Sequence, residues 1–420
     1  MTSADDGIPR RPAGFLLPYA EILRIPRAWE FLVAGIIGRM PMSMAGLGMV
    51  LLISASTGRY AVAGSVSAAA SLGMAACGPQ FGRLIDRYGQ GRVIVPMAMG
   101  FAAGIAGLIL AVELGAPSWT YFPPGVVAGA AMPALGPMSR ARWRALLAGS
   151  PRLHTAFSLE SVADELCFVI GPASVTVLAT QVHPAAGICV AAVLCLGGTL
   201  WFASQRETEP LAASPHAQPE RLHSGRGTAR RARLASPSLA ILMPVYVFLG
   251  AMFVTVDLST VAFAAHSGHK NLAGLVLGTY ALGSATGGLW YGARTWTAPA
   301  ARRLAVTLTL TVAGVCTFWA MPDLAALTAL IFLCGLTIAP TLIAGYSLLE
   351  STVQPGRTTE AMSWLSTGIY VGVGAGSTAA GFILDALGPR YGYAFAACCG
   401  CLAVALYLAG LFHTQRLRSA

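Results

Sequence analysis

The most regular feature of the chain is a series of apolar runs of about 20 residues, separated by shorter polar stretches. A helix of that length is long enough to cross a hydrocarbon core ~30 Å thick. The pattern therefore predicts an all-α membrane protein with twelve transmembrane helices. The predicted spans cover residues 29–55, 60–79, 92–112, 119–143, 156–181, 184–204, 238–264, 272–293, 303–321, 323–349, 360–385 and 391–412.

The longest polar stretch divides the spans into two sets of six. It covers residues 205–237, is rich in Arg, Ser, Pro and His, and lacks an apolar period, which is typical of a flexible linker. We therefore expect an N-terminal six-helix bundle at 1–204, a cytoplasmic linker at 205–237 and a C-terminal six-helix bundle at 238–420.

The two sets also share residues at a nearly constant offset. Arg152 recurs as Arg357, and Pro133 recurs as Pro340, each about 206 positions later and at an equivalent place in the predicted topology. A constant offset of this kind indicates an internal duplication. The two bundles are therefore expected to be pseudo-symmetric.

Composition supports the membrane assignment. Hydrophobic residues make up 55% of the chain and charged residues only 10%, against roughly 25% charged in a soluble domain. With both termini in the cytoplasm, 23 of the 27 Lys and Arg residues lie on the cytoplasmic side, as the positive-inside rule requires. Topology thus explains the net charge of +10 without a nucleic-acid partner. Arg outnumbers Lys 26 to 1, which is typical of a GC-rich bacterial genome. We therefore expect the protein in a bacterial inner (cytoplasmic) membrane.

The strongest local motif is GRLIDRYGQGR at residues 82–92, between the second and third spans. It resembles the loop motif that the major facilitator superfamily carries at this place. The resemblance implies a transporter that works by alternating access, with a cytoplasmic latch that engages spans 4 and 11. In physical terms, glycine permits close helix approach and a turn, and aspartate can meet a helix N-terminus or an arginine. The matching residues are Gly82, Leu84, Asp86, Arg87, Gly89 and Arg92.

A second group of charged residues lies near the same end of spans 4 and 5. Arg140 and Arg144 are one helical turn apart, and so are Glu160 and Asp164. The two faces could form an ion-pair ladder. This ladder is either a static clamp or a cytoplasmic gate that opens and closes.

Arg39 lies ten residues into the first span, roughly 15 Å deep at ~1.5 Å per residue. An arginine in mid-membrane costs about 2.5–3.5 kcal/mol, so its side chain should face a cavity or a partner. Asp164 or Glu165 is the expected partner. The resemblance places spans 1, 4, 7 and 10 around a central cavity, so Arg39 either belongs to the substrate or proton pathway or forms a buried structural pair.

Four further residues are candidates for the same pathway. Asp257 in span 7 is an intramembrane carboxylate without an obvious fixed cation, which suits reversible proton uptake. Alternatively, Asp257 is only a polar residue near the helix end that bonds to neighbouring Thr or Ser hydroxyls. Tyr246, Tyr346 and Trp364 could line an adaptable apolar pocket or serve only in helix packing.

The residues together favour a secondary transporter. Gly171 and Pro172 are similar to the Gly-Pro of the antiporter motif in span 5 of drug/proton antiporters, which implies a proton-coupled exporter of a small, partly apolar organic molecule. The alternatives are proton-coupled uptake of a sugar or metabolite, and a non-transporting receptor with the same fold. We expect a monomer whose partners are its substrate and the lipid bilayer, with a proton gradient in place of any cofactor.

An enzyme is not expected, because the sequence offers no nucleophile with a base, no phosphate loop and no metal-ligand cluster. The nine cysteines lie mostly inside apolar runs without Cys-x-x-Cys spacing, so we expect neither a metal site nor a disulfide.

Overall fold

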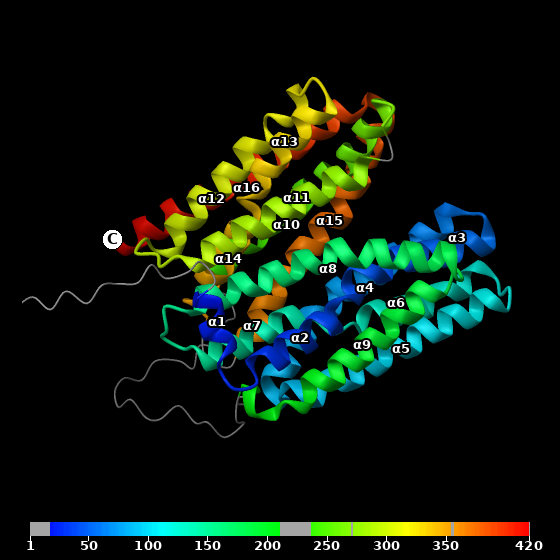
Figure 1. Cartoon of the computed structure of the whole chain (residues 1–420), viewed down its shortest axis with the longest axis horizontal. Coiled ribbons are helices and arrows are strands. Elements are labelled where there is room, and N and C mark those ends of the chain that lie inside the picture. Colours follow the sequence, from blue (N-terminus) through cyan, green and yellow to red (C-terminus); the bar gives the residue numbers. More distant parts are fainter. Residues whose placement is uncertain (1–16, 211–236, 270–271, 354–356, 420) are drawn as a thin grey trace, which may run out of the picture.

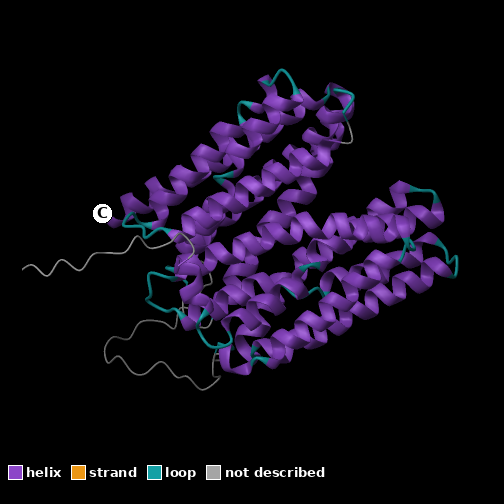
Figure 2. Ribbon diagram, viewed as in Figure 1, coloured by secondary structure: helices purple, strands orange, loops and turns teal. Residues whose placement is uncertain are grey.

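The computed structural model describes residues 17–210, 237–269, 272–353 and 357–419. In this part of the chain the backbone forms helices joined by short loops, and it contains no strand (Figure 2). Most of the predicted linker, residues 211–236, lies outside the described residues.

Helices α1 to α9 make up the N-terminal arm. The predicted spans 2, 3, 5 and 6 are continuous helices, whereas spans 1 and 4 are each divided into two. The elements are α1 (Leu17–Leu23), α2 (Ala28–Arg39), α3 (Pro41–Thr57), α4 (Tyr60–Tyr88), α5 (Gln90–Glu113), η1 (Ser118–Tyr121), α6 (Phe122–Ala130), α7 (Leu135–Leu146), α8 (Leu153–Gln181), α9 (Ala186–Ser204) and η2 (Arg206–Thr208).

Helices α10 to α16 make up the C-terminal arm, where only the predicted span 10 is divided into two α-helices. The elements are α10 (Pro237–His266), α11 (Ala273–Ala293), α12 (Ala300–Val315), η4 (Phe318–Ala320), α13 (Leu324–Gly335), α14 (Ile338–Glu350), α15 (Thr358–Leu387) and α16 (Pro389–Ser419).

The divided spans break close to prolines. Pro41 is the first residue of α3, Pro133 lies in the gap between α6 and α7, and Pro340 follows the break between α13 and α14. Proline lacks the N–H that a continuous helix needs and clashes with the preceding turn. The residues matched by the offset, Pro133 and Pro340, thus mark breaks in equivalent spans of the two arms.

Ten of the spans are long and apolar enough to cross a membrane by length and composition. The pair α6 and α7 and the glycine-rich α11 are not among them. Large apolar side chains are exposed on the outer surface, such as Leu72 at 69% and Phe382 at 74%. Water would not favour such a surface, whereas lipid tails would.

The two arms meet at one end of the molecule and diverge towards the other (Figure 1). The closed end is the end at which α1, the C-terminal part of α7 and the start of α15 lie. Two seams join the arms, because α4 packs against α15 and α8 packs against α11. The open end is the opposite one, near the tips of α3 and α13.

Within the C-terminal arm, α10 and α15 cross at backbone contact. A Cβ atom on Gly372 would overlap the carbonyl oxygen of Val247, and one on Gly250 would overlap that of Ile369. Glycine is therefore required at both positions for the helices to approach this closely. The close packing makes the arm a rigid wall for the space between the arms.

Candidate functional site

A cavity of about 920 Å³ lies between the arms, with residues of both arms in its wall. It reaches towards the open end, since its wall includes Val177 near the end of α8 and Gly274 at the start of α11. The wall is mostly apolar and rich in methionine and phenylalanine, namely Met42, Met74, Met97, Met132, Phe81, Phe168 and Phe253. Its charged members are Arg39, Arg140, Asp164, Glu165 and Asp257.

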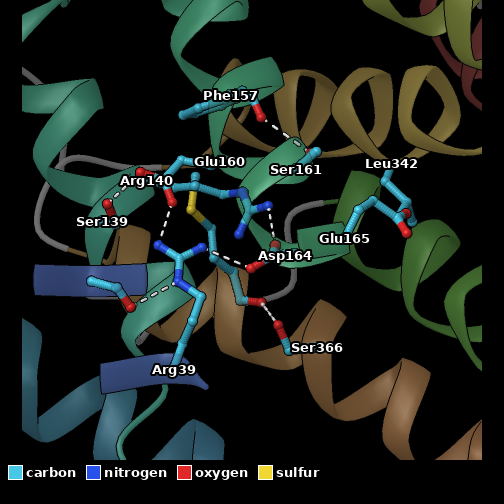
Figure 3. A network of polar contacts seen from close by, with 12 residues as sticks. Arg39, Ser139, Arg140, Phe157, Glu160, Ser161, Asp164, Glu165, Leu342 and Ser366 are labelled. Atoms are coloured by element: carbon cyan, nitrogen blue, oxygen red, sulfur yellow. Dashed lines mark hydrogen bonds and ion pairs between the residues drawn. The ribbon is translucent and has the colours of Figure 1, made fainter. Parts of the chain in front are cut away.

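Arg39 is buried in a network of charged groups at the inner part of the wall (Figure 3). Its Nη1 donates to Oδ1 of Asp164 at 2.7 Å, and its Nη2 pairs with the carboxylate of Glu160. Arg140 donates from Nη2 to Oδ2 of Asp164 at 2.8 Å. Two guanidinium groups and two carboxylates therefore balance each other, as buried charges require.

Glu160 lies inside this network rather than at the surface of a gate. Its side chain is fully buried. It accepts further hydrogen bonds from the Ser139 hydroxyl and from Nε1 of Trp143, the latter at 2.8 Å. Hydrogen bonds as well as charges therefore hold the facing sides of spans 4 and 5 together.

The ion-pair ladder forms only in part. Arg140 pairs with Asp164, but Arg144 does not pair with Glu160. Instead Arg144 crosses to the other arm, where it pairs with Glu350 at 2.9 Å and donates to the carbonyl oxygen of Val353 at 3.0 Å. Its Nη1 also donates to the Thr358 hydroxyl. The i,i+4 spacing fixes which residues share a helix face, but not which neighbour lies beside the last turn.

Glu165 is not a partner of Arg39. It accepts a hydrogen bond from the Ser284 hydroxyl of α11 at 2.7 Å. Asp257 of α10 is exposed to the same cavity. Within the described part of the chain, neither carboxylate forms an ion pair.

The three aromatic candidates fall in different places. Tyr346 lines the cavity, and the guanidinium of Arg140 lies over its ring, 4.3 Å from the centroid. Tyr246 is fully buried and donates to the carbonyl oxygen of Leu342 at 3.2 Å. Trp364 is half-buried. Neither Tyr246 nor Trp364 is part of the cavity wall, so the two are packing residues in this conformation.

The loop motif closes the α4–α15 seam. The Asp86 carboxylate accepts from the backbone N–H of Thr359 at 3.2 Å and of Glu360 at 2.9 Å, at the N-terminus of α15. A Cβ on Gly82 would lie 2.9 Å from the Cα of Glu360, so glycine permits this approach. Gly89 adopts a positive φ of 94° at the turn into α5.

The basic residues of the motif contribute differently from the prediction. Arg87 and Arg92 are exposed, and in the described ranges neither forms an ion pair. Arg83, which the motif match did not include, pairs with Glu360 at 2.8 Å across the seam. The latch therefore consists of Gly82, Asp86 and Arg83.

The α8–α11 seam is closed by hydroxyl groups. Ser158 donates to the carbonyl oxygen of Gly288, and Thr155 donates to that of Gly292 at 2.6 Å. Tyr19 of α1 donates to the carbonyl oxygen of Leu289 at 2.6 Å. Burial raises the pKa of Tyr19 to about 12, so its hydroxyl stays protonated and remains a donor at neutral pH.

Comparison with known proteins agrees with this arrangement. The sequence profile of the Major Facilitator Superfamily matches residues 31–292 and 247–419. The chain belongs to the major facilitator superfamily. No curated protein sequence matches it significantly.

Solved structures of superfamily transporters share the fold. The human organic anion transporter MFSD10 has a TM-score of 0.72 at 16% identity, covering 90% of this chain and 98% of its own. A bacterial homologue of the iron transporter ferroportin, in an outward-facing state, has a TM-score of 0.70 at 14% identity, and the match covers 91% of this chain and 98% of the homologue. The E. coli transporter FucP, in the outward conformation, has a TM-score of 0.68 at 15% identity, and the match covers 92% of this chain and 99% of FucP.

Several residues of this superfamily member escaped sequence reasoning. Arg142 is fully buried and donates to Gln90 at 2.8 Å and to the carbonyl oxygen of Phe202 at 2.9 Å, which fixes α7 to α5 and α9. A helical wheel could have identified this separate role of Arg142. Each residue of a helix turns by about 100°, so Arg142 faces away from Arg140. No sequence signal joins Ser284 to Glu165, since the two lie in different arms.

Proposed function

We propose that this chain is a proton-coupled secondary transporter that exports a small, partly apolar organic molecule by alternating access. The observation that carries the proposal is the pair of carboxylates, Glu165 and Asp257, in an otherwise largely apolar cavity between the arms. In the described residues no cation balances either of them. A carboxylate in this situation can be neutralised by a proton or by a cationic group of the substrate, and exchange of the two couples their movements.

The contacts at the closed end support alternating access. Under the positive-inside rule, the basic residues favour a cytoplasmic location for this end. Opening it would break the Asp86 contacts with α15 on one seam and the Ser158 contact with Gly288 on the other. Both seams rest on hydrogen bonds and a few ion pairs, which contribute ~0.5–3 kcal/mol each. Such contacts can be exchanged for equivalent ones when the arms rock.

Transport assays test the proposal. The protein would be reconstituted in vesicles that contain a pH-sensitive dye, and three probes would be added in turn: tetraphenylphosphonium, fucose and benzoate. We expect at least one probe to drive proton movement in the direction opposite to its own. The double variant E165Q/D257N should lose this movement. Glu113→Gln, at an exposed carboxylate at the end of α5, should retain it.

The outcome that contradicts the proposal is also clear. Proton movement that is absent with all three probes, or unchanged in the double variant, means that the two carboxylates do not couple transport to protons. The direction is tested in inside-out vesicles with an acidic interior, in which an exporter accumulates its probe.

A further inference from the structure

The charges in the cavity wall do not cancel. Arg39 and Arg140 are neutralised by Glu160 and Asp164, and Asp164 lies 2.7 Å from Arg39 and 2.8 Å from Arg140. Among the charged residues that line the cavity, this leaves two carboxylates, Glu165 and Asp257, and no unpaired cation. The arginines therefore present no free positive charge to a substrate, and a cavity with an acidic excess attracts cations.

The two remaining carboxylates line the same cavity, although they come from different arms. Glu165 belongs to α8 and Asp257 to α10, and the charge of Glu165 acts on Asp257. Tyr280 of α11 lines the same cavity and lies within electrostatic range of both carboxylates. Its side chain is only 7% exposed, and its hydroxyl has no hydrogen-bond partner among the described residues. A buried hydroxyl without a protein partner is usually completed by an ordered water or by a ligand.

The surroundings of the acid pair favour an organic ion over a metal ion. Phe253 and Val254 precede Asp257 on the cavity wall, and Phe168 and Val169 follow Glu165. Hard divalent cations prefer six or more oxygen ligands, and the described residues contain no group of three potential metal ligands among His, Cys, Asp and Glu. Aromatic rings beside carboxylates suit a cation that carries apolar groups.

We propose that Glu165, Asp257 and Tyr280 form the binding site of an organic cation with aromatic or alkyl substituents, for which the two carboxylates provide the counter-charge. The inference rests on the proposed function and names its substrate class. The cation and protons compete for the same two carboxylates, so binding weakens as the pH falls. The other titratable groups on the cavity wall are Arg39, Arg140, Asp164, Tyr346 and Tyr370.

The direct test is a binding measurement on the purified full-length protein. Tetraphenylphosphonium and tetraphenylborate have the same shape and opposite charge, so their comparison isolates the charge of the ligand. We expect tetraphenylphosphonium to bind and tetraphenylborate not to bind. E165Q and D257N should each weaken the binding of the cation by about tenfold or more. Tyr280→Phe should weaken it by a few fold, and the exposed Asp323→Asn should leave it unchanged.

A second measurement does not depend on the variants folding. Dicyclohexylcarbodiimide modifies protonated carboxyl groups in apolar surroundings, and mass spectrometry locates the product. In the wild-type protein, tetraphenylphosphonium should protect Glu165 and Asp257 from modification, whereas tetraphenylborate should not.

Three results would overturn the cation site. They are equal binding of the two probes, unchanged cation binding in both E165Q and D257N, and binding of Mn²⁺ at the two carboxylates without binding of tetraphenylphosphonium. If fucose or benzoate still drives proton movement, the proposed function stands without the cation site. If tetraphenylphosphonium binds as expected but none of the three probes moves protons, the cation site stands and proton coupling is refuted.

Discussion

Replacing Asp86 by asparagine tests whether the α4–α15 latch holds the closed end together. The carboxylate accepts two backbone N–H groups at the start of α15, at 3.2 and 2.9 Å. Asparagine has the same shape but only one acceptor oxygen, and its NH₂ group would face a backbone donor. The substitution therefore removes charge and one acceptor from a contact that exists only while this end is closed.

The expected magnitude follows from these contacts. Hydrogen bonds to a charged group contribute ~1.5–3 kcal/mol, against ~0.5–1.5 kcal/mol for neutral pairs. The favourable position of a negative charge at a helix N-terminus adds ~0.3–1 kcal/mol. Asp86→Asn should therefore raise the free energy of the closed-end state by about 2 kcal/mol. This corresponds to a shift of roughly 30-fold in the equilibrium between the two conformations.

Distance measurements between the arms can detect this shift. Spin labels would be placed at the open end, at Glu113 of α5 and His266 of α10, which are both exposed. Exposed native cysteines would be replaced by alanine first. The wild type should give mainly the longer distance. Asp86→Asn should add a shorter one, because opening the closed end brings the opposite tips together.

The control removes a carboxylate at the same end that does not join the arms. Glu207 pairs with Arg27 at 2.9 Å within the N-terminal arm and is 72% exposed. Glu207→Gln should leave the distances unchanged. An unchanged distance distribution in Asp86→Asn, or an equal shift in both variants, would show that the contact with α15 does not set the equilibrium.

Three further substitutions test the packing and the second seam. Arg39→Met should lower the free energy of unfolding by about 3 kcal/mol or more, because it leaves a buried carboxylate without its partner. Thermal unfolding in detergent measures this loss of stability, which should be smaller in Arg39→Lys. Gly372→Leu should abolish the recovery of monodisperse protein in size-exclusion chromatography, whereas Gly374→Leu, which points into open space, should not. Tyr19→Phe removes the donor to the carbonyl of Leu289 and should favour the shorter spin-label distance by about 1 kcal/mol.

The helices were largely predictable, because the length of an apolar run is set by the membrane itself. The span expected at 184–204 is α9 at Ala186–Ser204, for example. The breaks within three spans were not predicted, since mean hydropathy over a window does not register a local loss of helix. The prolines near each break carried that information.

The candidate site was predictable only where a local rule applies. Arg39 needs a buried counter-charge, and the predicted span 5 carries three acids, Glu160, Asp164 and Glu165, so its pair with Asp164 could be anticipated. Arg144 and Glu350 are 206 residues apart and meet only because the arms close at this end. No periodicity within one helix can indicate such a contact.

The neighbouring acids Asp164 and Glu165 show how a step of one residue along a helix separates two roles. Successive residues of a helix point about 100° apart. Asp164 faces Arg39 and Arg140 of its own arm, whereas Glu165 faces Ser284 of the other arm. If the arms move as rigid bodies, Asp164 keeps its partners throughout and Glu165 exchanges them. Only the second carboxylate can therefore sense the position of the arms, and it is the one that no arginine balances.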